Sequence, residues 1–138
     1  MRYLVLFVAI VAGISLTGCG DKDPFNRQAV PGTVTMDGKP IPLGNIEFVP
    51  TEKQSTPLTL EIKDGKFSTS KKNGLSPGKY IVRIQGFDGP MPLSGDVPGE
   101  TKGPLPKSIV PDKYGPRSTE TTVIQDGDAN ELSFVLVK

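Results

Sequence analysis

The pair Asp64-Gly65 constrains the fold of this chain most strongly, because it lies between two runs in which apolar and polar residues alternate. Residues 58–62 (LTLEI) precede the pair and residues 66–69 (KFST) follow it. Alternation with period two is typical of a half-buried strand, and an Asp-Gly pair between two such runs is the strongest short-range hairpin signal. The sequence therefore predicts an antiparallel hairpin here.

The same alternation recurs along the chain, separated by turn signals such as Asp37-Gly38-Lys39-Pro40 and Pro77-Gly78. The 16 glycines and 14 prolines among 138 residues also favour many turns and short strands. No segment has the period of an amphipathic helix. The pattern predicts seven strands in one all-β domain, a β-sandwich of two antiparallel sheets. The expected strands cover residues 30–36, 45–49, 58–62, 66–69, 80–87, 119–125 and 132–137.

The segment 88–118 breaks this rhythm, because it is long and rich in proline and glycine. Loops of this length are uncommon in compact domains and often carry function. We expect residues 107–114 to dock on the sandwich through Ile109, Val110 and Tyr114. Leu93, Leu105 and Tyr114 are candidate contact residues for a partner. The alternative interpretation is a passive insertion.

The N-terminus has the pattern of a secretory signal peptide: Arg2, an apolar run over residues 3–14, and then small residues. Leu16-Thr17-Gly18-Cys19 closes this run and resembles the bacterial lipobox. In proteins with that motif the cysteine receives a diacylglycerol and becomes the first residue of the mature chain. Cys19 is also the only cysteine, so it has no disulfide partner within the chain.

The lipobox resemblance implies three segments: a cleaved signal peptide over 1–18, the lipidated Cys19 with a polar tether over 19–29, and a folded domain over 30–138. It also implies export and a lipid anchor in the cell membrane or outer membrane, facing the periplasm or the cell surface. The residue after the cysteine is Gly20 rather than Asp. By resemblance to one known sorting rule, this favours the outer membrane, and the alternative stays open.

Composition limits the chemistry. The chain has no histidine, which removes the commonest general base and the commonest metal ligand. Its 16 basic and 15 acidic residues are balanced, so nothing favours nucleic-acid binding. We expect no catalytic residue, metal or cofactor.

Several motifs in order resemble the carboxypeptidase regulatory-like domain, a transthyretin-like (prealbumin-type, Ig-like) seven-stranded β-sandwich. They are residues 34–41 (VTMDGKPI), 46–50 (IEFVP), 64–67 (DGKF) and 74–82 (GLSPGKYIV). Residues 109–114 and 127–132 look like the closing part of small bacterial lipoproteins of this type. The resemblance implies a fold and no activity. The related hydrolases need catalytic histidines, which this chain lacks.

Other polar residues have a functional and a structural interpretation. Lys63, Lys66, Lys71, Lys72 and Lys79 surround the predicted hairpin and are candidates for binding an anionic glycan, lipid or peptidoglycan. Their alternative role is solubility.

Two groups of residues with side-chain oxygens fit a structural role better than a functional one. Asp126, Asp128 and Asn130 have the spacing of a calcium loop, but the bidentate glutamate of such a loop is missing, so turn residues are the favoured interpretation. Glu47, Glu61 and Glu120 lie on the polar phase of their strands and fit a solvated face.

The sequence therefore predicts a lipid-anchored envelope protein whose domain has a non-enzymatic binding or structural role. Its partners are membrane lipid through Cys19 and an envelope protein or glycan. One alternative is a subunit of an envelope assembly, joined through strand edges or the loop 88–118. An enzyme of unrecognised type is a third alternative, which the missing histidines and metal ligands disfavour.

Overall fold

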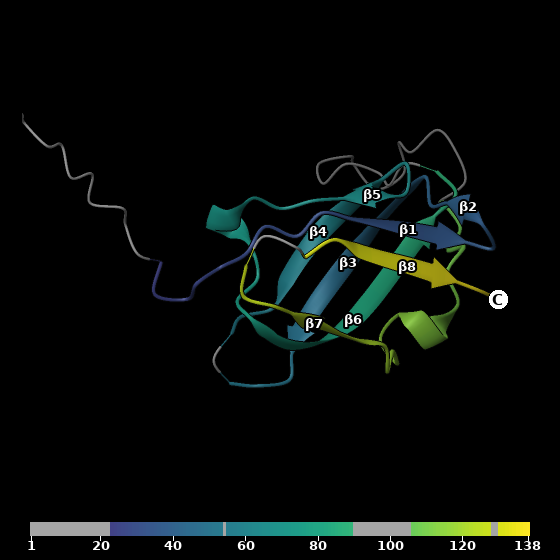
Figure 1. Cartoon of the computed structure of the whole chain (residues 1–138). Helices are drawn as coiled ribbons and strands as arrows, with labels where there is room; N and C mark the ends of the chain where they lie inside the picture. The colour runs from purple at the N-terminus through teal and green to yellow at the C-terminus, as the bar shows by residue number, and fades with distance from the viewer. Residues whose placement is uncertain (1–22, 54, 90–105, 128–129) are drawn as a thin grey trace, which may run out of the picture.

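A computed structural model describes residues 23–53, 55–89, 106–127 and 130–138 (Figure 1). These residues form an all-β fold with two single-turn 3-10 helices, η1 and η2. The elements in chain order are β1 (Gly32–Met36), β2 (Lys39–Pro40), β3 (Leu43–Pro50), β4 (Leu58–Lys63), β5 (Lys66–Phe67), η1 (Lys71–Asn73), β6 (Gly78–Phe87), η2 (Asp112–Tyr114), β7 (Thr121–Ile124) and β8 (Leu132–Leu136). No helix among them is long and apolar enough to cross a membrane.

The strands form one curled sheet in the order β2-β1-β5-β4-β3-β6-β7, and β8 pairs with β1. In Figure 1, β1 and β8 lie across β3, β4 and β6. The alternation in the sequence explains which side chains face inward. Val34, Ile46, Phe48, Ile62 and Val82 from these strands are all fully buried in one apolar core. Polar residues between them point outward, as period two requires.

Two Asp-Gly turns fold as the sequence predicts. Asp64 and Gly65 have φ angles of 49° and 72°, and Asp37 and Gly38 have 49° and 79°. Positive φ at both central residues is typical of a type I′ turn, whose twist matches that of the flanking strands. The first turn joins β4 to β5. The second adds a short strand that the sequence does not predict, because Lys39–Pro40 pairs back on β1 as β2.

The predicted antiparallel arrangement is wrong at one strand. β8 pairs with β1 in parallel, with Gly32 opposite Leu132 and Met36 opposite Leu136. The reason is the connection that precedes β8. β7 pairs with β6 at one side of the curled sheet, and the chain then crosses to the other side instead of turning back on β7.

Part of the long segment docks on the core as expected. Ser108 bridges Phe87, Val110 is 6% exposed, and Ile109 packs against the core. η2 places Tyr114 at the end of β8, where its hydroxyl accepts a hydrogen bond from the N–H of Val137 at 3.2 Å. Leu93 and Leu105 lie outside the described residues.

The folded unit begins before Val30, which is where the sequence places its start. Gln28 is 2% exposed, and its backbone N–H and C=O both pair with Leu75. Residues 23–28 therefore lie against the domain, although the sequence describes them only as polar and without a period. The predicted cleavage after residue 18 and the lipidation of Cys19 lie outside the described residues.

Candidate functional site

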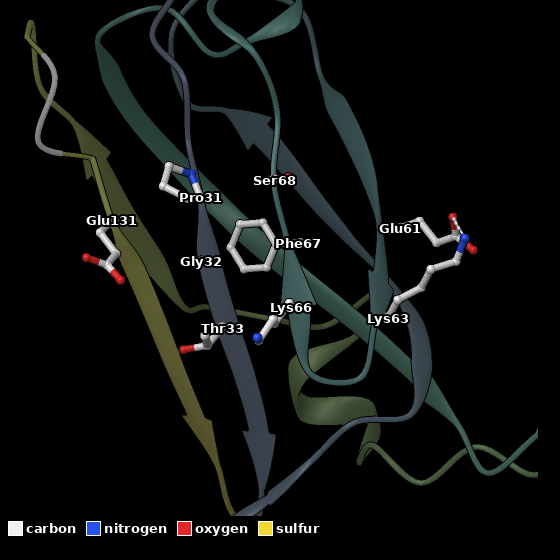
Figure 2. A pocket seen from close by; sticks show the side chains of 9 residues that line it. All are labelled: Pro31, Gly32, Thr33, Glu61, Lys63, Lys66, Phe67, Ser68 and Glu131. Atoms are coloured by element: carbon white, nitrogen blue, oxygen red, sulfur yellow. Dashed lines mark ion pairs between the residues drawn. The ribbon is translucent and has the colours of Figure 1, made fainter.

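A hollow of about 610 Å³ lies where β1, β4 and β5 meet (Figure 2). The β4–β5 hairpin creates it. β5 pairs with β4 only at Lys63 and Lys66, and it pairs with β1 at Gly32 and Thr33. The sheet therefore turns a corner here, and the two neighbours of β5 diverge. The lining residues are Pro31, Gly32, Thr33, Glu61, Lys63, Lys66, Phe67, Ser68 and Glu131.

The floor of the hollow is the ring of Phe67, which is 4% exposed. This ring lies 5.9 Å from the ring of Phe48 and 6.2 Å from that of Phe134, measured between centroids. Gly32 lies against its edge, and a Cβ at this position would collide with Phe67 Cζ and with the carbonyl oxygen of Leu132. The rim is therefore backbone at one point, and the aromatic floor is held in place from below.

Charged and hydroxyl groups surround this floor. Lys63 Nζ lies 3.1 Å from Glu61 Oε2, and both side chains are well exposed. Figure 2 shows this pair on one side of Phe67, Thr33 and Glu131 on the other side, and Lys66 next to the ring, below it in this view. Among the described residues, neither Lys66 nor Glu131 belongs to an ion pair.

The groups around this floor can bind a polar ligand. Lys66 offers an ammonium group, Glu131 a carboxylate, and Thr33 and Ser68 offer hydroxyl groups. These groups can hydrogen-bond a ligand that carries hydroxyl and carboxylate groups. Exposed charges of this kind contribute modestly each, so such a ligand would bind through several weak contacts.

The predicted basic residues occupy different elements. Lys63 and Lys66 share the hollow, whereas Lys71 and Lys72 lie on η1 and Lys79 lies on β6 opposite Val123 of β7. Tyr114 is 9% exposed, so its ring is mostly part of the core. The sequence pattern does not mark Gly32, Phe67 and Glu131 as site residues. The available signal was Gly32, a glycine at an inward position of an alternating strand.

Glu47 and Glu61 each form an ion pair with a basic side chain. Glu47 bonds Arg83 at 3.3 Å, Glu61 bonds Lys63, and Glu120 lies before β7. Asn130 is 5% exposed and serves the turn after β7. Its Oδ1 accepts from the N–H of Gln125, and its Nδ2 donates to two carbonyl oxygens. Within the described part of the chain, no group of three or more metal-ligating side chains comes together.

A second hollow of about 450 Å³ lies at the end of the molecule where the described chain begins. Its lining includes Phe25, Arg27, Leu75 and Tyr80. Arg27 also donates to the carbonyl oxygen of Lys72 at 2.7 Å, which ties the N-terminal segment to η1.

No protein-family model, no curated protein and no solved structure matches this chain.

Proposed function

We propose that this protein is an exported lipoprotein of the cell envelope, anchored by lipid on Cys19, whose domain binds a polar ligand without catalysis. The observation that carries the anchor is Leu16-Thr17-Gly18-Cys19 directly after an apolar run. In the proposed modification, Cys19 Sγ loses its proton and forms a carbon–sulfur bond to a diacylglycerol donor, whose head group leaves. Hydrolysis of the Gly18–Cys19 peptide bond then releases the signal peptide.

The proposed anchor is strong enough to hold the domain at a membrane. Each buried CH₂ contributes about 0.8 kcal/mol, and two acyl chains make a stable anchor where one is marginal.

For the domain we infer a transthyretin-like sandwich of the carboxypeptidase regulatory-like type. The curled all-β sheet, the alternating burial and the packing of Phe48 against Tyr80 and Phe67 support this assignment. We infer that the hollow over Phe67 binds an envelope glycan, because hydroxyl and carboxylate groups complement Lys66, Glu131 and Ser68.

One observation favours an assembly subunit as the second candidate function. The N–H of Leu132 donates to the carbonyl oxygen of Pro31, and the carbonyl oxygen of Leu136 accepts from the N–H of Asp37. The backbone N–H and C=O groups of the even-numbered residues of β8 therefore face β1. The backbone of Ser133 and Val135 therefore faces the other edge of β8. No strand of the described residues pairs with that edge, and Val135 is 68% exposed. An unpaired edge with an exposed valine can accept a strand from another chain.

Metabolic labelling with radioactive palmitate tests the anchor. Label should enter the wild-type protein and be absent from Cys19→Ser. Persistent label in Cys19→Ser would contradict the proposed lipoprotein.

Thermal unfolding with peptidoglycan fragments tests the ligand site. The fragments should raise the Tm of the wild type saturably, because they bind only the folded state. Lys66→Glu should lose this shift, and Lys79→Glu, a matched reversal on β6, should keep it. An equal shift in both variants, or no shift in the wild type, would contradict binding in this hollow. A discrete envelope protein crosslinked to a probe at Val135 would instead support the assembly subunit.

A further inference from the structure

The first described residues are held firmly against the domain. Asp23 accepts hydrogen bonds from the backbone N–H groups of Phe25 and Arg27, at 3.1 and 3.0 Å, and from Arg27 Nε at 2.9 Å. Arg27 then reaches the carbonyl oxygen of Lys72. Gln28 is buried and pairs with Leu75. Arg27 and Gln28 therefore attach the segment to the domain, and Asp23 is held to Arg27.

This attachment shortens the proposed tether. Only Gly20, Asp21 and Lys22 separate Cys19 from Asp23. An extended chain spans at most about 3.6 Å per residue, so the Cα atoms of Cys19 and Asp23 lie within roughly 14 Å of each other. The head-group region of a bilayer is itself several ångströms thick. A lipid on Cys19 would thus bring this end of the domain to the membrane surface.

The residues at this end suit such a surface. The Phe25 side chain is 54% exposed, although it is large and apolar, and the Arg27 guanidinium lies 5.6 Å from its ring centroid. Lys71 and Lys72 on η1 are exposed, and η1 has no acidic residue in its first turn. Figure 1 shows η1 and the N-terminal segment at one end of the molecule and the C-terminus at the other.

The two carboxylates described at this end both contact other residues of the protein. Asp23 is occupied by Arg27, and Asp126 accepts from Gln28 Nε2 at 3.3 Å. Within the described residues, Lys71 and Lys72 belong to no ion pair. The two ammonium groups are therefore available to head-group phosphates, which attract lysines near a membrane surface.

We propose that Phe25, Arg27, Lys71 and Lys72 form a membrane-contact face that rests on the phospholipid bilayer. The ring of Phe25 lies among the head groups, and the lysines face lipid phosphates. This inference rests on the proposed lipidation of Cys19. It adds a fixed orientation to the anchor: the hollow over Phe67 and the edge of β8 belong to a domain held close to the bilayer, not one at the end of a long tether.

Single-tryptophan fluorescence tests the face in the mature lipidated protein. The chain has no tryptophan, so Phe25→Trp introduces a unique probe, and Val135→Trp is the matched control on exposed β8. Both variants are reconstituted in vesicles of phosphatidylcholine and phosphatidylglycerol that carry a bromine-labelled lipid quencher. We expect Phe25→Trp to shift its emission to shorter wavelength and to be quenched, and Val135→Trp to show neither change.

Charge reversal separates the role of the lysines. Lys71→Glu with Lys72→Glu should lower the quenching of Phe25→Trp, whereas Lys63→Glu with Lys66→Glu should not. A lipidated, vesicle-bound protein with unquenched Phe25→Trp would overturn the membrane-contact face and leave the lipoprotein intact. An unmodified Cys19 would overturn both. Equal quenching of the two tryptophan probes would also overturn the fixed orientation.

Discussion

The carboxylate of Asp23 and the side chain of Arg27 form an ion pair within the N-terminal segment, with 2.9 Å between Oδ2 and Nε, and Arg27 Nη1 donates to the carbonyl oxygen of Lys72 in the domain. Burial raises the pKa of Asp23, but the hydrogen bonds from Arg27 and Phe25 and the charge of Arg27 outweigh it. The net effect holds the pKa of this carboxyl below its ordinary value of 3.8. The ionised form of Asp23 therefore favours the docked segment.

This lowered pKa predicts that acid weakens the docking of the segment. A depressed pKa in the folded state stabilises that state above the ordinary value, and the contribution is lost as the pH falls through the lowered pKa. The protection of the Gln28 and Leu75 amides from hydrogen exchange, relative to the intrinsic rate at each pH, should therefore fall below about pH 3.8. Asp23→Asn should show the lower protection already at neutral pH. Asp126→Asn is the control, because Asp126 also contacts Gln28. If neither a lower pH nor Asp23→Asn changes the protection of these amides, ionised Asp23 does not stabilise the docked segment.

Gly32→Ala should destabilise the fold, because the new Cβ would collide with Phe67 and with the backbone of β8. Overpacking of a fitted core costs about 1–3 kcal/mol. Urea unfolding measures the change in the free energy of unfolding. Ser68→Ala, at the exposed rim of the same hollow, should stay within about 0.5 kcal/mol of the wild type. Equal stability of Gly32→Ala and wild type would show that the ring of Phe67 is not fixed against β1.

Asn130→Ala should lower the free energy of unfolding by about 1–3 kcal/mol, because it removes three hydrogen bonds between this buried side chain and backbone groups of the turn. Asn130→Asp keeps the shape but cannot donate to the carbonyl oxygens of Gln125 and Gly127, so we expect it to be destabilising as well. Thermal unfolding with and without calcium supplies the control for the alternative role. A calcium-dependent rise in the Tm of the wild type would favour a cation site here.

Tyr114→Phe should lower the free energy of unfolding by about 0.5–1.5 kcal/mol, the usual net value of one hydrogen bond. The lost bond is the one from Val137 N–H, which fastens the end of the chain after β8 to η2. Amide exchange at Val137 should accelerate more than exchange at Val34 in the core. Unchanged exchange at Val137 would show that the hydroxyl does not protect this strand end.

The sequence predicts the local features of the fold well, because alternation and turn chemistry are local. Residues 58–69 show an inward row of Leu58, Leu60 and Ile62 and a hairpin turn at Asp64-Gly65, both as expected. The docking of Val110 follows from apolar residues inside a polar loop. Each of these inferences needs only neighbours in the chain.

Long-range pairing could not be predicted in the same way. Period two tells which face of residues 132–136 is buried, but not that this strand runs parallel to β1. The hollow over Phe67 depends on the point where β5 leaves β4 for β1, which no local pattern encodes. The burial of Gln28 could not be predicted either, because nothing in the polar sequence around it distinguishes a buried glutamine from an exposed one.

Mass spectrometry of the N-terminal tryptic peptide tests the proposed anchor most directly. If Cys19 is lipidated and the signal peptide is removed, trypsin should release residues 19–22 (CGDK) with the added mass of a diacylglyceryl group, with or without an amide-linked acyl chain. Cys19→Ser should not yield this peptide. Recovery of residues 3–22 as one peptide with a free thiol on Cys19 would contradict the lipoprotein and, with it, the membrane-contact face.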